Sequence, residues 1–178
     1  MRMETDGAEA DLLGKALGGD AAARGDLVRR HYGAVYSLAW KLTRHVETAR
    51  DVAQEAFLRA FSRLGSHDPR FSFGSWVLKI ASNHALDLLR QAGRREPLPE
   101  EVEPPSPESV LERGEDLARV RRALDALPPD TRAALVLHLQ ESLPLREIAF
   151  VLDLSENAVR NRIWRGLQKV RADLREDP

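Results

Sequence analysis

Arginine, lysine and asparagine side chains gather in the stretch NAVRNRIWRGLQKVR, at residues 157–171. After Ala158 this stretch contains five arginine or lysine residues and no aspartate or glutamate. Arginine can pair with guanine or with phosphate through two hydrogen bonds, and asparagine can pair in the same way with adenine. These residue types in one short stretch therefore suit the binding of an anionic polymer rather than catalysis of a reaction.

The same stretch has the apolar period of a helix. At about 100° per residue, its apolar side chains fall within one narrow stripe and the basic side chains occupy the remaining surface. The stripe consists of Val159, Ile163, Leu167, Val170 and Leu174. A charged outer face is often only a solvated face, but such faces usually mix both signs of charge. A surface of one sign carries mutual repulsion, which bound phosphates would relieve.

A second, shorter helix is predicted just before the cationic one. Pro144 suits a first helical turn, and the apolar residues that follow it continue to Leu152. Three turn residues come next, the last of which is Ser155, a preferred residue for capping the start of a helix. A short helix, a three-residue turn and a basic helix are the parts of a helix-turn-helix, whose second helix lies in the major groove of DNA.

Other combinations of reactive residues do not form a persuasive site. Ser66, His67 and Asp68 are hydrolase residue types, but neighbours in sequence cannot converge on one substrate atom. His138 and Glu141 are one turn apart and have no evident third metal ligand. The chain has no cysteine and no glycine-rich phosphate loop. We therefore expect a protein that is not an enzyme and that needs no metal or cofactor.

Charge is divided unevenly along the chain, although the formal net charge is only −1. Residues 24–95 carry thirteen basic and six acidic side chains, whereas residues 96–116 carry one and eight. The stretch REPLPEEVEPPSPES at 95–109 holds five prolines and five glutamates, which disfavour both a helix and a core. We expect two domains, at 24–92 and 117–175, joined by a flexible acidic linker at 93–116.

Helical periodicity is present on both sides of this linker. Apolar residues recur every three or four positions over 27–42, 48–64 and 76–88, and helices are also predicted over 117–127 and from 129 or 130 to about 141. No stretch alternates with the period of a strand. The sequence therefore predicts an all-α fold of two small helical domains, the second of which contains the helix-turn-helix.

Four stretches resemble bacterial RNA polymerase sigma factors of the sigma-70 family, particularly the extracytoplasmic-function group. They are ARDVAQEAFLRAF at 49–61, FGSWVLKIASNHALDLLR at 73–90, LDALPPDTRAALVLHL at 124–139 and LREIAFVLDLSENAVRNRIWRGLQKVR at 145–171. These stretches occur in the family's order and are interrupted by a linker where the family has one. The resemblance covers roughly residues 24–92 and 117–174.

The resemblance implies a factor that binds core RNA polymerase, directs it to promoters and helps to open the DNA. The residues implied to bind the clamp of the largest polymerase subunit are Asp51, Gln54 and Glu55. Those implied to capture and melt the −10 promoter element are Arg70, Phe71, Phe73, Lys79 and Asn83. Those implied to read the −35 promoter element are Asn157, Ala158, Arg160, Asn161, Arg162 and Arg165. An anti-sigma factor is a further implied partner.

Two other functions are compatible with a helix-turn-helix in an all-α chain. One is a stand-alone transcriptional regulator that binds operator DNA, and the other is a module of helical hairpins that binds acidic proteins. A regulator with a receiver domain would alternate strands and helices, which the residues before the linker do not do. We expect the protein in the cytoplasm and not inserted in a membrane, because the sequence shows neither a signal-peptide pattern nor an apolar run of about 18 residues.

Overall fold

The computed structural model describes residues 2–92 and 114–176. Within these ranges the chain forms eight α-helices, one short 3₁₀ helix and no strand, which confirms the all-α prediction. The helices are α1 (Arg2–Leu17), α2 (Ala21–Thr43), α3 (Val46–Ser62), η1 (Leu64–Ser66), α4 (Phe73–Ala92), α5 (Gly114–Asp125), α6 (Pro129–Leu139), α7 (Leu145–Leu152) and α8 (Glu156–Glu176). Residues 93–113 of the predicted linker lie outside the described residues.

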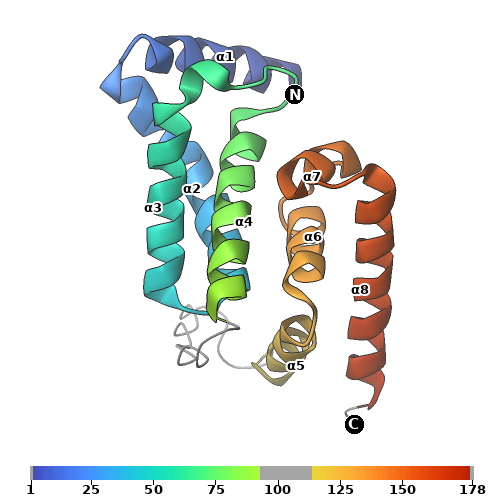
Figure 1. Cartoon of the computed structure of the whole chain (residues 1–178). Helices are drawn as coiled ribbons and strands as arrows, with labels where there is room; N and C mark the ends of the chain where they lie inside the picture. The colour runs from blue at the N-terminus through green and yellow to red at the C-terminus, as the bar shows by residue number, and fades with distance from the viewer. Residues whose placement is uncertain (1, 93–113, 177–178) are drawn as a thin grey trace.

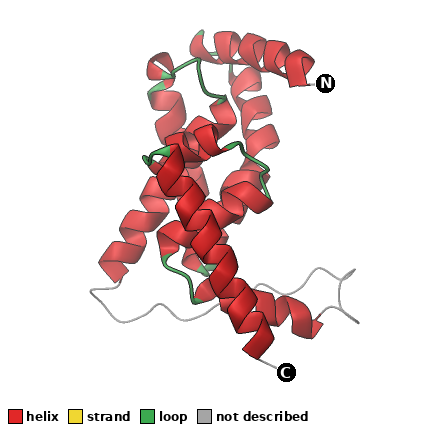
Figure 2. Ribbon diagram, turned by 90° about the vertical axis from the view of Figure 1, so that its right-hand side faces the viewer, coloured by secondary structure: helices red, strands yellow, loops and turns green. Residues whose placement is uncertain are grey.

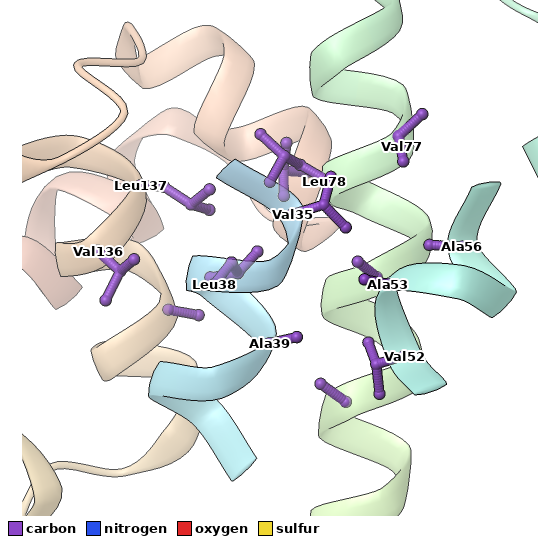
Figure 3. Packing of buried hydrophobic residues seen from close by; sticks show 14 of the residues in the cluster. Val35, Leu38, Ala39, Val52, Ala53, Ala56, Val77, Leu78, Val136 and Leu137 are labelled. Atoms are coloured by element: carbon purple, nitrogen blue, oxygen red, sulfur yellow. The ribbon is translucent and has the colours of Figure 1, made fainter. Parts of the chain in front are cut away.

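Helices α2, α3 and α4 pack side by side, and α1 crosses one end of the three (Figure 1). The apolar stripe predicted over 48–64 is the buried face of α3. Its buried members are Ala49, Val52, Ala53, Ala56, Phe57 and Ala60. Because four of these six are alanines, α3 can approach its neighbours closely, and larger side chains from α2 and α4 complete the core (Figure 3).

The helix α1 was not predicted from the sequence. Its Ala16 is fully buried and Leu12 and Leu13 pack against the same core. Glu9 lies close to two other elements, since its carboxylate contacts His31 Nε2 at 2.9 Å and accepts a hydrogen bond from the backbone N–H of Phe73 at 3.2 Å. The helix therefore joins α2 to the beginning of α4.

Helices α5 to α8 form the second unit, in which α8 lies on the outside (Figures 1 and 2). Val159 and Ile163 of α8 are buried, as the predicted stripe requires. Gly166 lies on the same face, where an added Cβ would come within 2.7 Å of Leu135 Cδ1 and 2.9 Å of Thr131 Cγ2 in α6. The absence of a side chain at this position therefore allows α6 and α8 to pack closely.

The two units share a continuous apolar core. Helix α6 packs against α2 and α4, and Val136 and Leu137 of α6 lie near Leu38 of α2 (Figure 3). Polar contacts reinforce the junction, because Arg44 after α2 forms a 2.6 Å ion pair with Asp125 at the end of α5. Among the described helices, none has both the length and the apolar character needed to cross a membrane.

Candidate functional site

The helix-turn-helix forms as the sequence predicts. Helix α7 ends at Leu152, and Asp153 adopts the left-handed conformation with φ 53° and ψ 48°. The backbone N–H groups of Asp153 and Leu154 both donate to the carbonyl of Ala149, which closes the turn. Ser155 Oγ then accepts a hydrogen bond from the N–H of Ala158 at 3.2 Å and caps α8, as its residue type predicted.

The outer face of α8 presents polar and cationic side chains to solvent. Asn157, Arg160, Asn161 and Arg165 are exposed, and Arg160 donates a hydrogen bond to Asn157 Oδ1 at 2.9 Å. This bond lies within one turn at the start of the helix, so it holds both side chains on the surface. The basic residues of the first turns are therefore outside the core, as the helical period predicted.

Four of the six residues predicted to contact duplex DNA line one depression beside α6. It has a volume of about 430 Å³ and is lined by Pro128, Asp130, Thr131, Ala158, Asn161, Arg162 and Arg165. Within it, Arg162 Nη2 lies 3.7 Å from Asp130 Oδ2. Trp164, which was not selected from the sequence, is 62% exposed on the same helix. Trp164 could have been recognised from the sequence, because it is a large apolar residue among cationic ones.

The residues predicted to bind polymerase lie on the outward face of α3. Asp51 and Gln54 are exposed, and Glu55 is partly exposed and forms a 2.6 Å ion pair with Arg59 one turn later. All three leave the buried stripe of the helix. They form a polar surface on the side of α3 that is not packed against α4.

An apolar groove of about 460 Å³ adjoins this surface between α2 and α3. It is lined by Val28, Tyr32, Arg50, Gln54, Phe57, Leu58 and Phe61. Leu58 is 58% exposed and Tyr32 is 40% exposed. Tyr32 belongs to the apolar period predicted over 27–42, but it lines this groove and is not part of the buried core. Leu58 was not singled out from the sequence, although it is an apolar residue outside the helical stripe and could have been recognised for that reason.

The residues predicted to capture the −10 element are not all available at the surface. Phe73 is 0% exposed and packs among Phe61, His31 and Trp76, so the structure corrects its expected role as a contact with DNA. The reason is local, since Phe73 is the first residue of α4 and its side chain falls on the packed face.

Arg70 is exposed in the loop before α4 and is bound to Asp68. Its guanidinium donates to both carboxylate oxygens, with 2.6 Å between Nη2 and Oδ2, and its backbone N–H donates to Oδ1. These bonds lower the pKa of Asp68 to about 2 and raise the pKa of Arg70. Asp68 is thus engaged by Arg70, while His67 packs against Trp76 rather than assembling a reactive group with Asp68.

Phe71, Lys79 and Asn83 face the second unit. The Phe71 ring stacks on Phe150 of α7, while Lys79 Nζ and Asn83 Nδ2 both contact the carboxylate of Asp153. The structure therefore brings together three residues predicted on α4 and its preceding loop, but it places them against the helix-turn-helix. No cluster of three potential metal ligands is found among the described residues.

Two family models match the chain in the order in which the helices occur. The model for sigma-70 region 2 matches residues 27–95, and the model for sigma-70 region 4 matches residues 117–170. The first match contains most of α2 together with α3 and α4, and the second contains α6, α7 and most of α8.

The chain is 39% identical over 163 residues to the extracytoplasmic-function RNA polymerase sigma factor SigE of Mycolicibacterium smegmatis, covering 86% of this chain and 63% of SigE. The chain thus spans less than two thirds of that relative. It is also 31% identical over 182 residues to the RNA polymerase sigma-H factor of Pseudomonas aeruginosa, covering 94% of each. The solved structure of CnrH, in complex with the cytosolic domain of CnrY, superimposes with a TM-score of 0.74 at 31% identity and covers 96% of this chain and 99% of that one. Family models, relatives and fold agree, and the chain belongs to the extracytoplasmic-function group of sigma-70 family RNA polymerase sigma factors.

Proposed function

We propose that this protein is a transcription initiation factor that binds core RNA polymerase, directs it to specific promoters and assists DNA opening. The observation that carries this proposal is α8, which packs through one apolar stripe and presents cationic side chains outward in a helix-turn-helix. Residues 24–92 form the domain for polymerase and the −10 element, residues 93–116 the linker, and residues 117–175 the domain for the −35 element.

The −35 element is bound by the first turns of α8 in the major groove. Arg160 and Arg165 supply exposed guanidinium groups, and Asn161 supplies an amide suited to adenine. Asn157, Ala158 and Arg162 complete the surface, with Arg162 steered by Asp130. Each well-placed base contact discriminates between sequences by about 1–3 kcal/mol.

Core polymerase is bound by the outward face of α3. Asp51, Gln54 and Glu55 meet the clamp of the largest subunit, and the neighbouring groove between α2 and α3 accepts apolar side chains from that partner. Two acids in a domain whose net charge is positive are suited to a basic partner surface. The polymerase then performs the chemistry, and the factor itself is not an enzyme.

The −10 element is held by the loop before α4 and the exposed side of α4. Phe71 stacks on an unpaired base, and Arg70, Lys79 and Asn83 bind the strand. Unstacking a base costs a few kcal/mol of free energy. Stacking of that base on an aromatic ring contributes about 1–3 kcal/mol in return. Phe73 supports this loop from the core instead of contacting DNA.

An anti-sigma factor is a further proposed partner. The support is that CnrH, which covers nearly the whole chain at 31% identity, was solved in complex with the cytosolic domain of CnrY. Such a partner would compete with polymerase for the surfaces described above.

Transcription in vitro with core polymerase and a promoter library tests the proposed function. We expect specific initiation only when both this protein and core polymerase are present. Tight binding to a DNA site without polymerase, together with no stimulation of transcription, would instead identify a stand-alone regulator. Neither activity would identify a protein-interaction module and would reject the proposal.

A further inference from the structure

The helix-turn-helix covers the residues proposed above to hold the promoter strand. Helix α7 lies beside the first half of α4, at the end of the molecule nearest α1 (Figure 1). The contact is formed by side chains of α7 and of the turn after it. It involves Phe71, Lys79 and Asn83, three of the four residues to which the strand is assigned.

Two aromatic rings form the centre of this contact. The rings of Phe71 and Phe150 are 3.7 Å apart between centroids and inclined by only 9°. Each unit also places a cation over the ring of the other, since Arg146 Cζ lies 5.3 Å from the Phe71 ring and Lys79 Nζ lies 4.5 Å from the Phe150 ring. A flat, nearly parallel stack at this distance is the arrangement that a nucleic-acid base adopts on an aromatic side chain.

An anion lies next to the stacked ring. The Asp153 carboxylate forms an ion pair with Lys79 through one oxygen, and its second oxygen accepts a hydrogen bond from Asn83 Nδ2 at 3.4 Å. An ammonium and an amide directed at one group of oxygens would serve equally for a phosphate. Phe150 and Asp153 are only three residues apart, so one short segment presents both a flat ring and an anion.

The surrounding space is open rather than filled. A cavity of about 470 Å³ is lined by residues of both units, including Phe71, Lys79, Arg146, Phe150 and Asp153. The Asp153 side chain is 60% exposed. The contact therefore combines stacked rings with charged groups and is accessible to solvent, unlike the closed apolar junction between α2 and α6.

We propose that Phe150 and Asp153 act as an internal substitute for a nucleotide, in which the ring stands for a base and the carboxylate for a phosphate, and that they close the strand-binding site of the free protein. The inference rests on the proposed function, because that function assigns the strand to Phe71, Lys79 and Asn83. A promoter strand and the α7–α8 turn cannot occupy these side chains together. Binding of core polymerase would have to draw the two units apart before a strand could enter.

Two substitutions open this contact by different means. Phe150→Ala removes the ring, and Asp153→Asn removes the charge while keeping a residue that tolerates the left-handed conformation of the turn. Asp87→Asn is a matched control, since its side chain is 59% exposed and also pairs with a cation, but it lies in the second half of α4. The helical circular dichroism of each variant shows whether it folds, and Asp153→Asn provides the test if Phe150→Ala does not.

The measurement is the affinity of the free protein for a fluorescent single-stranded oligonucleotide of mixed sequence, followed by anisotropy. If the open form is about a tenth of the population, opening the contact fully raises the apparent affinity about tenfold. We expect this gain for Phe150→Ala and Asp153→Asn, no such gain for Asp87→Asn, and disappearance of the gain when Phe71→Ala is added. Equal affinities for Asp153→Asn and Asp87→Asn, or a gain that survives Phe71→Ala, would overturn the proposal.

Transcription with core polymerase separates this inference from the proposed function. If the wild-type protein supports initiation but opening the contact does not improve strand binding, the internal substitute is rejected and the function stands. If the wild-type protein supports no initiation with core polymerase, the proposed function itself fails. If it supports initiation and the opened variants gain strand affinity through Phe71, both are supported.

Discussion

Arg132 in α6 donates a hydrogen bond to the backbone carbonyl of Lys41 near the end of α2, with 3.2 Å between Nη1 and the oxygen. The same guanidinium also donates to the carbonyls of Leu42, Asp125 and Leu127, and the residue is only 8% exposed. Burial lowers the pKa of Arg132, although the charge of Asp125 opposes this effect. Because the last carbonyls of a helix have no partner within it, this one side chain satisfies groups at the ends of both α2 and α5.

Arg132→Met should therefore lower the free energy of unfolding by about 1–3 kcal/mol, since it keeps much of the side-chain volume but leaves buried carbonyls without a donor. Urea denaturation followed by circular dichroism measures this change. Arg29→Met is the control, because the Arg29 side chain is 71% exposed on α2 and should change stability little. Equal effects of the two substitutions would show that Arg132 does not hold the junction.

Glu9 makes the stability of the protein depend on pH. Burial by itself raises the pKa of its carboxyl, but the hydrogen bond and charge of His31 and the N–H of Phe73 together lower the pKa below 4.5. A carboxyl with a depressed pKa in the folded state contributes stability that is complete above its unfolded value and is lost as the pH falls through the folded value.

Glu9→Gln should therefore reduce stability near neutral pH and should flatten the decline of stability below pH 4.5. Denaturation at a series of pH values between about 6 and 3 measures both effects. Asp11→Asn is the control, because Asp11 is an exposed acid on the same helix and pairs with Lys15 one turn away. A wild-type curve and a Glu9→Gln curve that stay parallel throughout would contradict the assignment.

The sequence predicted the local part of this structure better than the contacts between distant residues. The stripe of α3, the three-residue turn and the Ser155 cap depend on neighbours in sequence, and each was recognised from spacing and residue type. Helix α1 was not predicted, although Leu12, Leu13 and Ala16 are spaced as a helix face.

The burial of Phe73 and the pairing of Phe71 with Phe150 could not be predicted in this way. Periodicity shows which face of a helix is apolar, but it does not show which other element covers that face. Phe71 and Phe73 both lie between the helices predicted over 48–64 and 76–88, yet Phe73 packs in the core of the first unit and Phe71 packs against the second unit. Phe61 and Trp76 of the first unit pack against Phe73, whereas α7 covers Phe71.

Gly166 tests the close approach of α6 and α8. Gly166→Val should lower the free energy of unfolding by about 1–3 kcal/mol, because its side chain would overlap Leu135 and Thr131. Gly33→Ala in α2 is the matched control, since nothing lies within 4 Å of an added Cβ there. Replacement of an unobstructed helical glycine should stabilise by about 0.5–1 kcal/mol, so thermal unfolding should shift in opposite directions for the two variants. A shift in the same direction would argue against a steric limit at Gly166.

The outward face of α3 can be tested separately from the proposed DNA-binding surfaces. The double variant Asp51→Ala, Glu55→Ala should lose binding to core polymerase but keep its helical circular dichroism, because both residues lie outside the buried stripe. Co-purification with core polymerase measures the loss. Asp26→Ala, Asp87→Ala removes two acids elsewhere in the same unit, whose side chains are 46% and 59% exposed, and serves as the control. Retention of polymerase by the first variant would reject the proposed role of this face.

The cationic face of α8 predicts a particular dependence on salt. Arg160→Ala and Arg165→Ala should each weaken binding of the polymerase complex to duplex promoter DNA. Each arginine–phosphate contact that is lost should also reduce the slope of log affinity against log salt concentration by about 0.9. Arg162→Ala should weaken binding for two reasons. The variant loses a cation, and the carboxylate of Asp130, which no longer pairs with Arg162, repels the DNA. Arg175→Ala is the control at the other end of the same helix, where the charge is exposed but lies outside the first turns. If the affinity for DNA and the salt slope are the same in the wild type and in the three α8 variants, these arginines do not contact DNA. If Arg175→Ala weakens DNA binding equally, the loss of affinity reflects overall charge and not a specific contact by the first turns of α8.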